Sequence, residues 1–425
     1  MTAEVGILNT VGVALAADSA VTIGPDADKI YSSAEKLFHL SESAPVGVMI
    51  NGNAAFLGVP WETIIKAYRK KNKENKFAML SEYRDDLIEF LESNRQMFSR
   101  ETKSHFVSLL INIYLRHIRD KVRITLDRRA EKSDGLGEDE IAPIVHEVIE
   151  KNFKFVTNKD KLTDFNRSIT SEIRKQYTRR ITASKKKIFA DLPMQVRTSR
   201  LISRLVIEVL TRDHMSPFKS GVVIAGFGEK EFMPRLYSVN VEIMAGNKLR
   251  AVSDKEVKIS HKTTASIVPF AQQEMVHTFL NGIDPGLANR IDDSSEALFH
   301  GIFDVLLSEV ASEDQRLAHA LRERLSSRID KLVESLHQDW KDQSRNHWMP
   351  IIKNVSSLPK DELGSMAEAL VNLTKFRRRV SQERETVGGP IDVAVITKGD
   401  GFVWVKRKHY FEPRLNPRTM AQFRR

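Results

Sequence analysis

The second residue of the chain, Thr2, is of a type that can supply a nucleophile and a base from one residue. Threonine is small enough for a preceding initiator methionine to be removed, so we expect cleavage of Met1 and exposure of Thr2 as the mature N-terminus. The hydroxyl of an N-terminal threonine can attack a carbonyl carbon. Its own α-amine, with an unperturbed pKa of about 7.7–8.0, can accept the proton at neutral pH without help from a histidine.

Two further groups would assist such a threonine. A neighbouring lysine would favour the deprotonated amine and hydroxyl electrostatically, and an aspartate would keep that lysine charged and in place. A Met-Thr start alone is common in ordinary proteins, so the chemistry depends on whether the following residues supply these partners.

Several other chemistries are excluded by what the sequence lacks. The 425 residues include no cysteine, which rules out disulfides, thiolate zinc sites and cysteine nucleophiles. There is no GxxxxGK[ST] phosphate loop, no GxSxG elbow and no HExxH pair. The histidines are scattered without ligand-like spacing. We therefore predict no metal and no cofactor.

Composition indicates a folded protein. Hydrophobic residues make up 41% of the chain and charged residues 29%, enough to bury a core over two or three domains. No apolar run reaches the roughly 20 residues of a membrane span, and the N-terminus lacks the basic region of a signal peptide. We expect a cytoplasmic protein without membrane contact. The net charge of +10 keeps nucleic acid open as a partner.

The order of elements predicts one sheet-rich domain interrupted by two helical insertions. Residues 2–60, 218–290 and 386–412 have alternating strand patterns and turn signals, including a hairpin turn at Lys398–Gly401. Residues 61–217 and 291–385 have apolar side chains at helical spacing, such as the stripe Leu298, Ile302, Val305 and Leu306. The first insertion is basic.

The residues after Thr2 carry a resemblance to a known family. An apolar strand runs into Ala16-Ala17-Asp18-Ser19, a lysine follows in EKLFHL (35–40), and a strand then ends in Asn51-Gly52. This series resembles the proteasome β-subunit and the bacterial HslV-type peptidase, which are N-terminal nucleophile hydrolases. The resemblance implies an α+β fold, namely a four-layer αββα sandwich, here with large helical insertions.

The resemblance also implies the site. Thr2 matches the nucleophile, Asp18 the aspartate that pairs with the lysine, and Lys36 the lysine, with Lys29 as the competing candidate. Gly52 matches the glycine whose N–H stabilises the oxyanion, a contribution that can reach about 10²–10³ in rate. The implied activity is that of a threonine peptidase acting on a peptide or protein substrate. Homo-oligomerisation and an ATP-dependent unfoldase as partner are implied as well.

The chain also departs from the family pattern. Where members often carry a Gly-Ser-Gly turn, this sequence has Pro269 and Phe270, and near the closing Gly388-Gly389 it has Arg384 and Val387. An alternative is therefore a catalytically silent assembly protein on the same fold. We interpret the closing glycines as a place of close strand packing.

The basic clusters of the first insertion allow a third function, nucleic-acid binding. We favour solvated helix faces, because acidic residues are interleaved among the basic ones. Only Tyr177 and Phe189 lie near the long lysine run as aromatic residues that could stack on bases.

Overall fold

The computed structural model describes residues 2–23, 29–132, 137–381, 387–409 and 411–417. The chain forms two compact units. The first comprises Met1–Leu37, Phe232–Pro234 and Lys258–Arg425, and the second comprises Phe38–Glu231 and Arg235–Val257. Each contains a five-stranded sheet and several helices. The predicted α+β class is therefore confirmed.

The sheet of the first unit has the order β12-β1-β2-β13-β14. Its strands are β1 (Glu4–Asn9), β2 (Gly12–Asp18), β12 (Ala265–Phe270), β13 (Ile391–Thr397) and β14 (Gly401–Lys406). β1 pairs antiparallel with β12 and β2, and β2 pairs antiparallel with β13. All residues of β1, β2 and β13 are buried. The near-continuous apolar runs in these strands are explained by burial on both faces.

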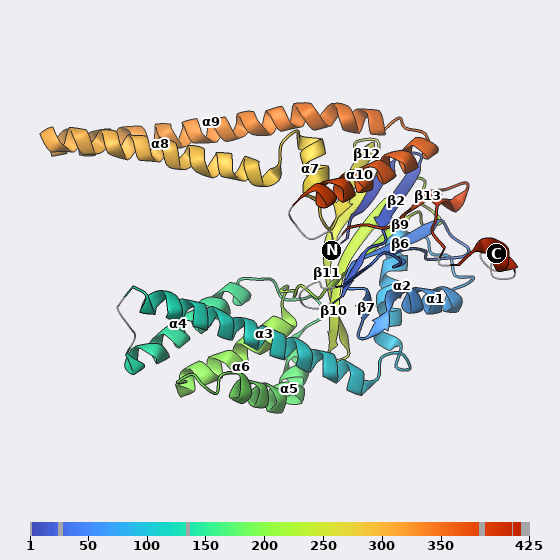
Figure 1. Cartoon of the computed structure of the whole chain (residues 1–425), viewed down its shortest axis with the longest axis horizontal. Helices are drawn as coiled ribbons and strands as arrows, with labels where there is room; N and C mark the ends of the chain where they lie inside the picture. Colours follow the sequence, from blue (N-terminus) through green and yellow to red (C-terminus); the bar gives the residue numbers. More distant parts are fainter. Residues whose placement is uncertain (1, 24–28, 133–136, 382–386, 410, 418–425) are drawn as a thin grey trace. The chain divides into compact units, whose positions relative to one another are not determined.

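Within the described residues, four α-helices belong to the first unit. They are α7 (Glu274–Asn281), α8 (Pro285–Glu313), α9 (Gln315–Val355) and α10 (Lys360–Val380). α10 packs on β1, β2 and β13 through Leu363, Ala367 and Leu370, which recur at helical spacing and are buried. α8 and α9 pair with each other, as Figure 1 shows. Asp314 joins them and caps α9 by accepting from the N–H groups of Arg316 and Leu317.

The sheet of the second unit has the order β11-β10-β9-β6-β5. Its strands are β5 (Leu37–His39), β6 (Val46–Gly52), β9 (Ser220–Gly226), β10 (Arg235–Ala245) and β11 (Lys248–Lys258). In the part of the chain that the structure describes, short strands also pair outside the two large sheets: β3 (Val21–Ile23) with β4 (Lys29–Tyr31), and β7 (Ala55–Phe56) with β8 (Val59–Pro60).

The helices of the second unit lie within residues 61–217. They are α1 (Trp61–Lys71), α2 (Leu80–Ser93), α3 (Arg100–Ala130), α4 (Glu138–Thr157), α5 (Arg167–Ile188) and α6 (Val196–Thr211). α2 packs against β9 and β10, and α3 against β10. α3 also contacts α4 and α5, and α6 contacts α4 and α5, so that α3 to α6 form a helical layer around one hydrophobic core.

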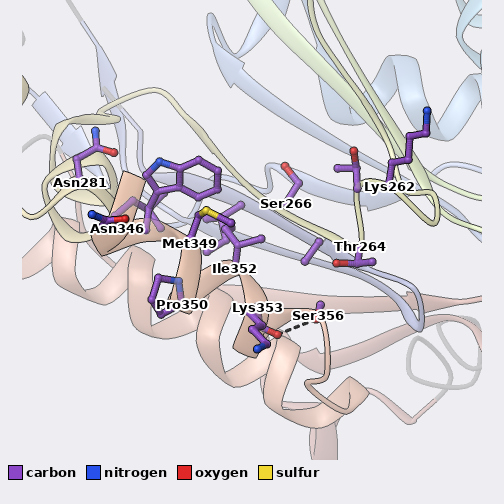
Figure 2. Close-up of a pocket in the computed structure, with 15 residues that line it drawn as sticks. Lys262, Thr264, Ser266, Asn281, Asn346, Met349, Pro350, Ile352, Lys353 and Ser356 are labelled. Atoms are coloured by element: carbon purple, nitrogen blue, oxygen red, sulfur yellow. Dashed lines mark hydrogen bonds between the residues drawn. The ribbon is translucent and has the colours of Figure 1, made fainter. Parts of the chain in front are cut away.

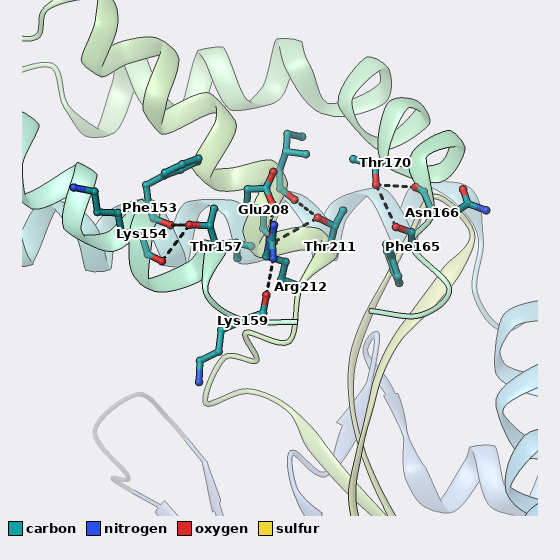
Figure 3. Close-up of polar contacts among 12 residues, drawn as sticks. Phe153, Lys154, Thr157, Lys159, Phe165, Asn166, Thr170, Glu208, Thr211 and Arg212 are labelled. Carbon is teal, nitrogen blue, oxygen red and sulfur yellow. Dashed lines mark hydrogen bonds and ion pairs between the residues drawn. The ribbon is translucent and has the colours of Figure 1, made fainter. Parts of the chain in front are cut away.

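Polar contacts join the ends of these helices. Figure 3 shows Arg212, just after α6, donating to the Glu208 carboxylate (2.5 Å) and to the carbonyl oxygen of Lys159 (2.6 Å), which follows α4. The fully buried Arg250 on β11 donates to the carbonyl oxygens of Val209 (2.8 Å) and Arg212 (3.1 Å). The Arg250 guanidinium thus satisfies carbonyls that the end of α6 leaves without a helical partner, and the Arg212 guanidinium satisfies a carbonyl just after α4.

Candidate functional site

Thr2, Asp18 and Lys36 come together inside the first unit. The Lys36 ammonium donates to the Thr2 hydroxyl (Nζ to Oγ1, 3.1 Å) and to the Asp18 carboxylate (Nζ to Oδ1, 2.6 Å). The exposed fractions of the three residues are 4%, 1% and 5%. A lysine thus bridges a hydroxyl and a carboxylate away from water, where charge interactions are strong.

The antiparallel pairing of β1 and β2 fixes the position of Thr2 relative to Asp18. β1 begins two residues after Thr2, and Asp18 is the last residue of β2. The N–H of Asp18 donates to the carbonyl oxygen of Ala3 (3.1 Å), and the N–H of Ala3 donates to the Asp18 carboxylate (3.1 Å). These two hydrogen bonds fix Ala3 against Asp18, and they therefore also fix the position of Thr2, the residue before Ala3. Lys36 reaches the site from the segment just before β5.

The Asp18 carboxylate has two more backbone donors. Its Oδ2 accepts from the N–H of Ala20 (3.2 Å) and from the N–H of Gly388 (3.0 Å). Gly388 in turn accepts from the N–H of Ser19 (3.2 Å). Three backbone amides and one ammonium therefore hold this carboxylate in one orientation.

Gly388 is a contributor that sequence reasoning missed. We interpreted Gly388 and Gly389 as a place of close strand packing. Among the described residues, no atom would lie within 4 Å of a Cβ on Gly388, so that interpretation is wrong there. It is right for Gly389, whose φ is +74° and whose Cβ would lie 2.8 Å from the Cβ of Ser32. The only signal in the sequence was the glycine pair itself, 370 residues after Asp18.

The other two predicted site residues are not part of this cluster as described. Lys29 begins β4, and its side chain lies outside the part of the chain that the structure describes. Gly52 ends β6 in the second unit with a φ of +75°, and a Cβ there would lie 2.5 Å from the carbonyl oxygen of Lys219. The backbone alone therefore requires glycine at this position. Its role as an oxyanion donor stays a prediction.

The residues that depart from the family pattern lie on β12 and near β13. Pro269 and Phe270 are on β12 and pair with Val5 and Glu4 of β1. β12 is an outer strand of its sheet, where a proline is tolerated because one side of the strand needs no ladder donor. Arg384 lies outside the described residues, and Val387 is buried.

A separate cavity of about 960 Å³ lies in the first unit between β12 and the C-terminal part of α9. Figure 2 shows Met349 and Ile352 of α9 on one side and Ser266 of β12 on the other. Thr2, Asp18 and Lys36 do not line it. Its lining is Lys262, Thr263, Thr264, Ala265, Ser266, Ile267, Leu280, Asn281, Asn346, Trp348, Met349, Pro350, Ile352, Lys353 and Ser356.

The described residues form neither a metal-binding cluster nor a membrane-spanning helix. No group of three or more histidine, aspartate or glutamate side chains is placed to hold a metal ion there. Across those same residues, every helix is too short or too polar to cross a membrane.

Comparison with known proteins gives little further information. No known family description matches the sequence, and no curated protein matches it. Among solved structures, the chain is similar to the Gly-1 mutant of Anbu from Hyphomicrobium sp. strain MC1, with 9% sequence identity and a TM-score of 0.30. The match covers 100% of this chain and 95% of that one. A TM-score this low does not establish a shared fold.

Proposed function

We propose that the protein is a threonine-type amide hydrolase, most simply a peptidase, whose nucleophile is Thr2 after removal of Met1. The observation that carries the proposal is the hydrogen-bonded series Asp18–Lys36–Thr2 within one buried cluster. An ion pair formed for stability alone would not need a hydroxyl as the third member. Here the ammonium is already in contact with the oxygen that would attack.

Each residue has a distinct part in the proposed reaction. The Thr2 Oγ1 forms a bond to the amide carbon, and the α-amine of Thr2 accepts the hydroxyl proton and passes it to the leaving amine. Lys36 stabilises the negative charge that develops on Oγ1 in the transition state, and Asp18 holds the ammonium in place. Water then hydrolyses the ester that links Thr2 to the acyl group. Lys36 and Thr2 touch the reacting atoms, whereas Asp18 acts as a positioning residue.

Removal of Met1 is central to this proposal, because it would create the free amine that acts as the base. Thr2 is 4% exposed, so the proposed reaction also requires that a substrate gain access to its hydroxyl. The four-layer sandwich, the homo-oligomer and the ATP-dependent unfoldase follow from the family resemblance and stay predictions.

The test combines mass with turnover. Intact mass spectrometry of the purified chain should show the loss of Met1. A library of fluorogenic peptides should then be hydrolysed by the wild type, and the Thr2→Ala variant should lose at least about 10³-fold in kcat/KM, since it has no nucleophile. Thr2→Ser should retain measurable turnover. Thr10→Ala, an exposed position in the turn between β1 and β2, serves as the matched control and should be unaffected.

Two results would contradict the hydrolase. If Met1 is retained, Thr2 has no free amine to act as the base. If turnover is absent, or is the same in Thr2→Ala, the hydrogen-bonded cluster is structural. The protein would then be the catalytically silent assembly protein that shares these residues.

A further inference from the structure

Helix α5 carries an unusual surplus of positive charge. Among its 22 residues, eight are basic and only Glu172 is acidic. The basic residues are Arg167, Arg174, Lys175, Arg179, Arg180, Lys185, Lys186 and Lys187. A helix face that is merely solvated usually alternates charges of both signs, because opposite charges four residues apart stabilise it. α5 lacks this alternation.

Three of these side chains lie along one line of the helix. Lys175, Arg179 and Lys186 are four and seven residues apart, a spacing that returns to the same side at 3.6 residues per turn. All three are exposed. The buried residues Ile173, Tyr177, Ile181 and Ile188 lie on the opposite side of α5.

Helix α6 repeats this arrangement. Arg197, Arg200 and Arg204 follow at intervals of three and four residues, and all three are exposed. The buried side of α6 is formed by Ile202, Leu205, Val206 and Val209. Both helices therefore bury an apolar side in the core of the second unit and turn a basic side outward.

The two basic sides belong to neighbouring helices. The Lys185 ammonium on α5 donates to the carbonyl oxygen of Ser199 (2.9 Å) and to the Ser203 hydroxyl (3.1 Å) on α6. We call Lys175, Arg179, Lys186, Arg197, Arg200 and Arg204 together the α5–α6 basic face. Within the residues that the structure describes, none of these six forms a salt bridge.

The geometry points to the phosphate backbone of nucleic acid as the partner of the α5–α6 basic face. Six cations that form no salt bridge within the described residues present repelling charges that a polyanion would neutralise, with release of its own counterions. The eleven residue-to-residue steps from Lys175 to Lys186 span about 16 Å of helix, long enough to follow several phosphates, since duplex DNA carries one charge per about 1.7 Å.

The position of the aromatic residues defines the kind of recognition. The sequence indicates Tyr177 and Phe189 as aromatic residues that could stack on bases. Their side chains are 1% and 4% exposed and belong to the core. They cannot stack on a base. Arginine and lysine contacts to phosphate carry no sequence information, so binding through this face is expected to be independent of sequence and to accept a duplex.

The experiment measures binding and its salt dependence with the full-length chain. The probe is a 30-base-pair DNA duplex with a fluorescent label, followed by anisotropy from 50 to 300 mM KCl. A plot of log Kd against log salt should have a slope of up to about 5 if all six cations contact phosphates, because each contact contributes about 0.9. Replacing Lys175, Lys186 and Arg200 with alanine should lower that slope by about 3. Two scrambled duplexes should bind within about twofold of each other.

Charge reversal with a matched control tests the location. Lys175→Glu, Lys186→Glu and Arg200→Glu together should weaken binding at least about 100-fold. The control reverses Arg316, Lys341 and Arg345 on α9, which are also exposed, and changes the net charge by the same amount. Circular dichroism should show equal helix content in both variants.

Three outcomes would overturn the inference. The first is absence of duplex binding at 50 mM KCl. The second is an equal loss of affinity in the α9 control, because net charge rather than this face would then be responsible. The third is equally tight binding of poly-glutamate with the same sensitivity to the α5 and α6 substitutions, which would indicate an acidic protein partner. Peptide hydrolysis through Thr2 is independent of all three results.

Discussion

Lys36 makes the two contacts that join the members of the candidate site. Its ammonium bonds to both Thr2 and Asp18 and is 5% exposed. We predict that Lys36→Met lowers the free energy of unfolding by about 3 kcal/mol, because it leaves the Asp18 carboxylate buried without its counter-ion. The three backbone N–H donors to Asp18 keep the loss at the low end of the range for broken buried pairs. Urea denaturation measures it.

The double variant Lys36→Met, Asp18→Asn supplies the control for this prediction. Removing both charges should recover part of the loss, since the charge without a partner is gone. Equal stability of wild type and Lys36→Met would mean that the ion pair does not form in solution.

His39, at the end of β5, gives the second unit a dependence on pH. Burial, and to a lesser degree the Arg69 guanidinium, lower the pKa of its imidazole to about 4 from the usual 6.5. The folded state therefore keeps His39 neutral in a range where the unfolded chain binds a proton. The free energy of unfolding should fall by up to about 3 kcal/mol as the pH drops from 7 through 6.5 to 4, and level off below that.

His39→Gln should remove this component. Denaturation curves of both proteins at pH 7.5, 5.5 and 4.5 give the comparison. A wild type and a variant that lose stability in parallel as the pH falls would show that His39 is not the group responsible.

At the residue level, the sequence predicted the three side chains that cluster but not the backbone groups around them. Thr2, Asp18 and Lys36 could be predicted because they lie within 36 residues and follow a recognisable series of strands and turns. Gly388 could not, because its contribution is a backbone N–H brought to Asp18 by the pairing of β2 with β13. A backbone N–H is present in every residue except proline, so the residue type does not show which one donates.

At the level of the elements, the segment that leads into β13 requires glycine at position 389 but not at position 388. Gly389→Ala should lower the free energy of unfolding by about 1–3 kcal/mol, since φ is +74° and the added Cβ would lie 2.8 Å from that of Ser32. Gly388→Ala should change it by less than about 0.5 kcal/mol, because no atom of the described residues lies within 4 Å of the new atom. Thermal unfolding of the two variants distinguishes them, and equal losses would contradict the assignment.

The helices could be predicted from the spacing of apolar residues. Which side of each helix is buried was harder to predict. The spacing of Leu298, Ile302 and Val305 correctly indicates a helix, yet these side chains are 60%, 51% and 61% exposed. α8 instead buries Phe303 and Leu307. Apolar stripes on both sides of α8 fit its period equally well. Only the position of its neighbour decides which stripe is covered.

At the scale of the whole molecule, β13 and β14, which come late in the sequence, complete the sheet of the first unit. β2 pairs with β1, which it follows directly, and with β13, which begins at Ile391. We predict that a chain ending at Ser381 is insoluble, because fully buried β2 would become an outer strand with unpaired backbone groups. Fractionation of cell lysates measures this against the full-length chain. A soluble, monodisperse truncated chain would contradict it.

The four polar contacts of Asp18 also affect how homologous sequences should be interpreted. Three of them go to the backbone of Ala3, Ala20 and Gly388, and therefore tie the chain start to a loop near its end whether or not catalysis takes place. Selection for folding alone would retain this aspartate in inactive descendants. Both hydrogen bonds of Lys36 go to Asp18 and Thr2. Under the proposed hydrolase function, the presence or absence of this lysine in aligned homologues should therefore distinguish active from inactive members better than the aspartate can.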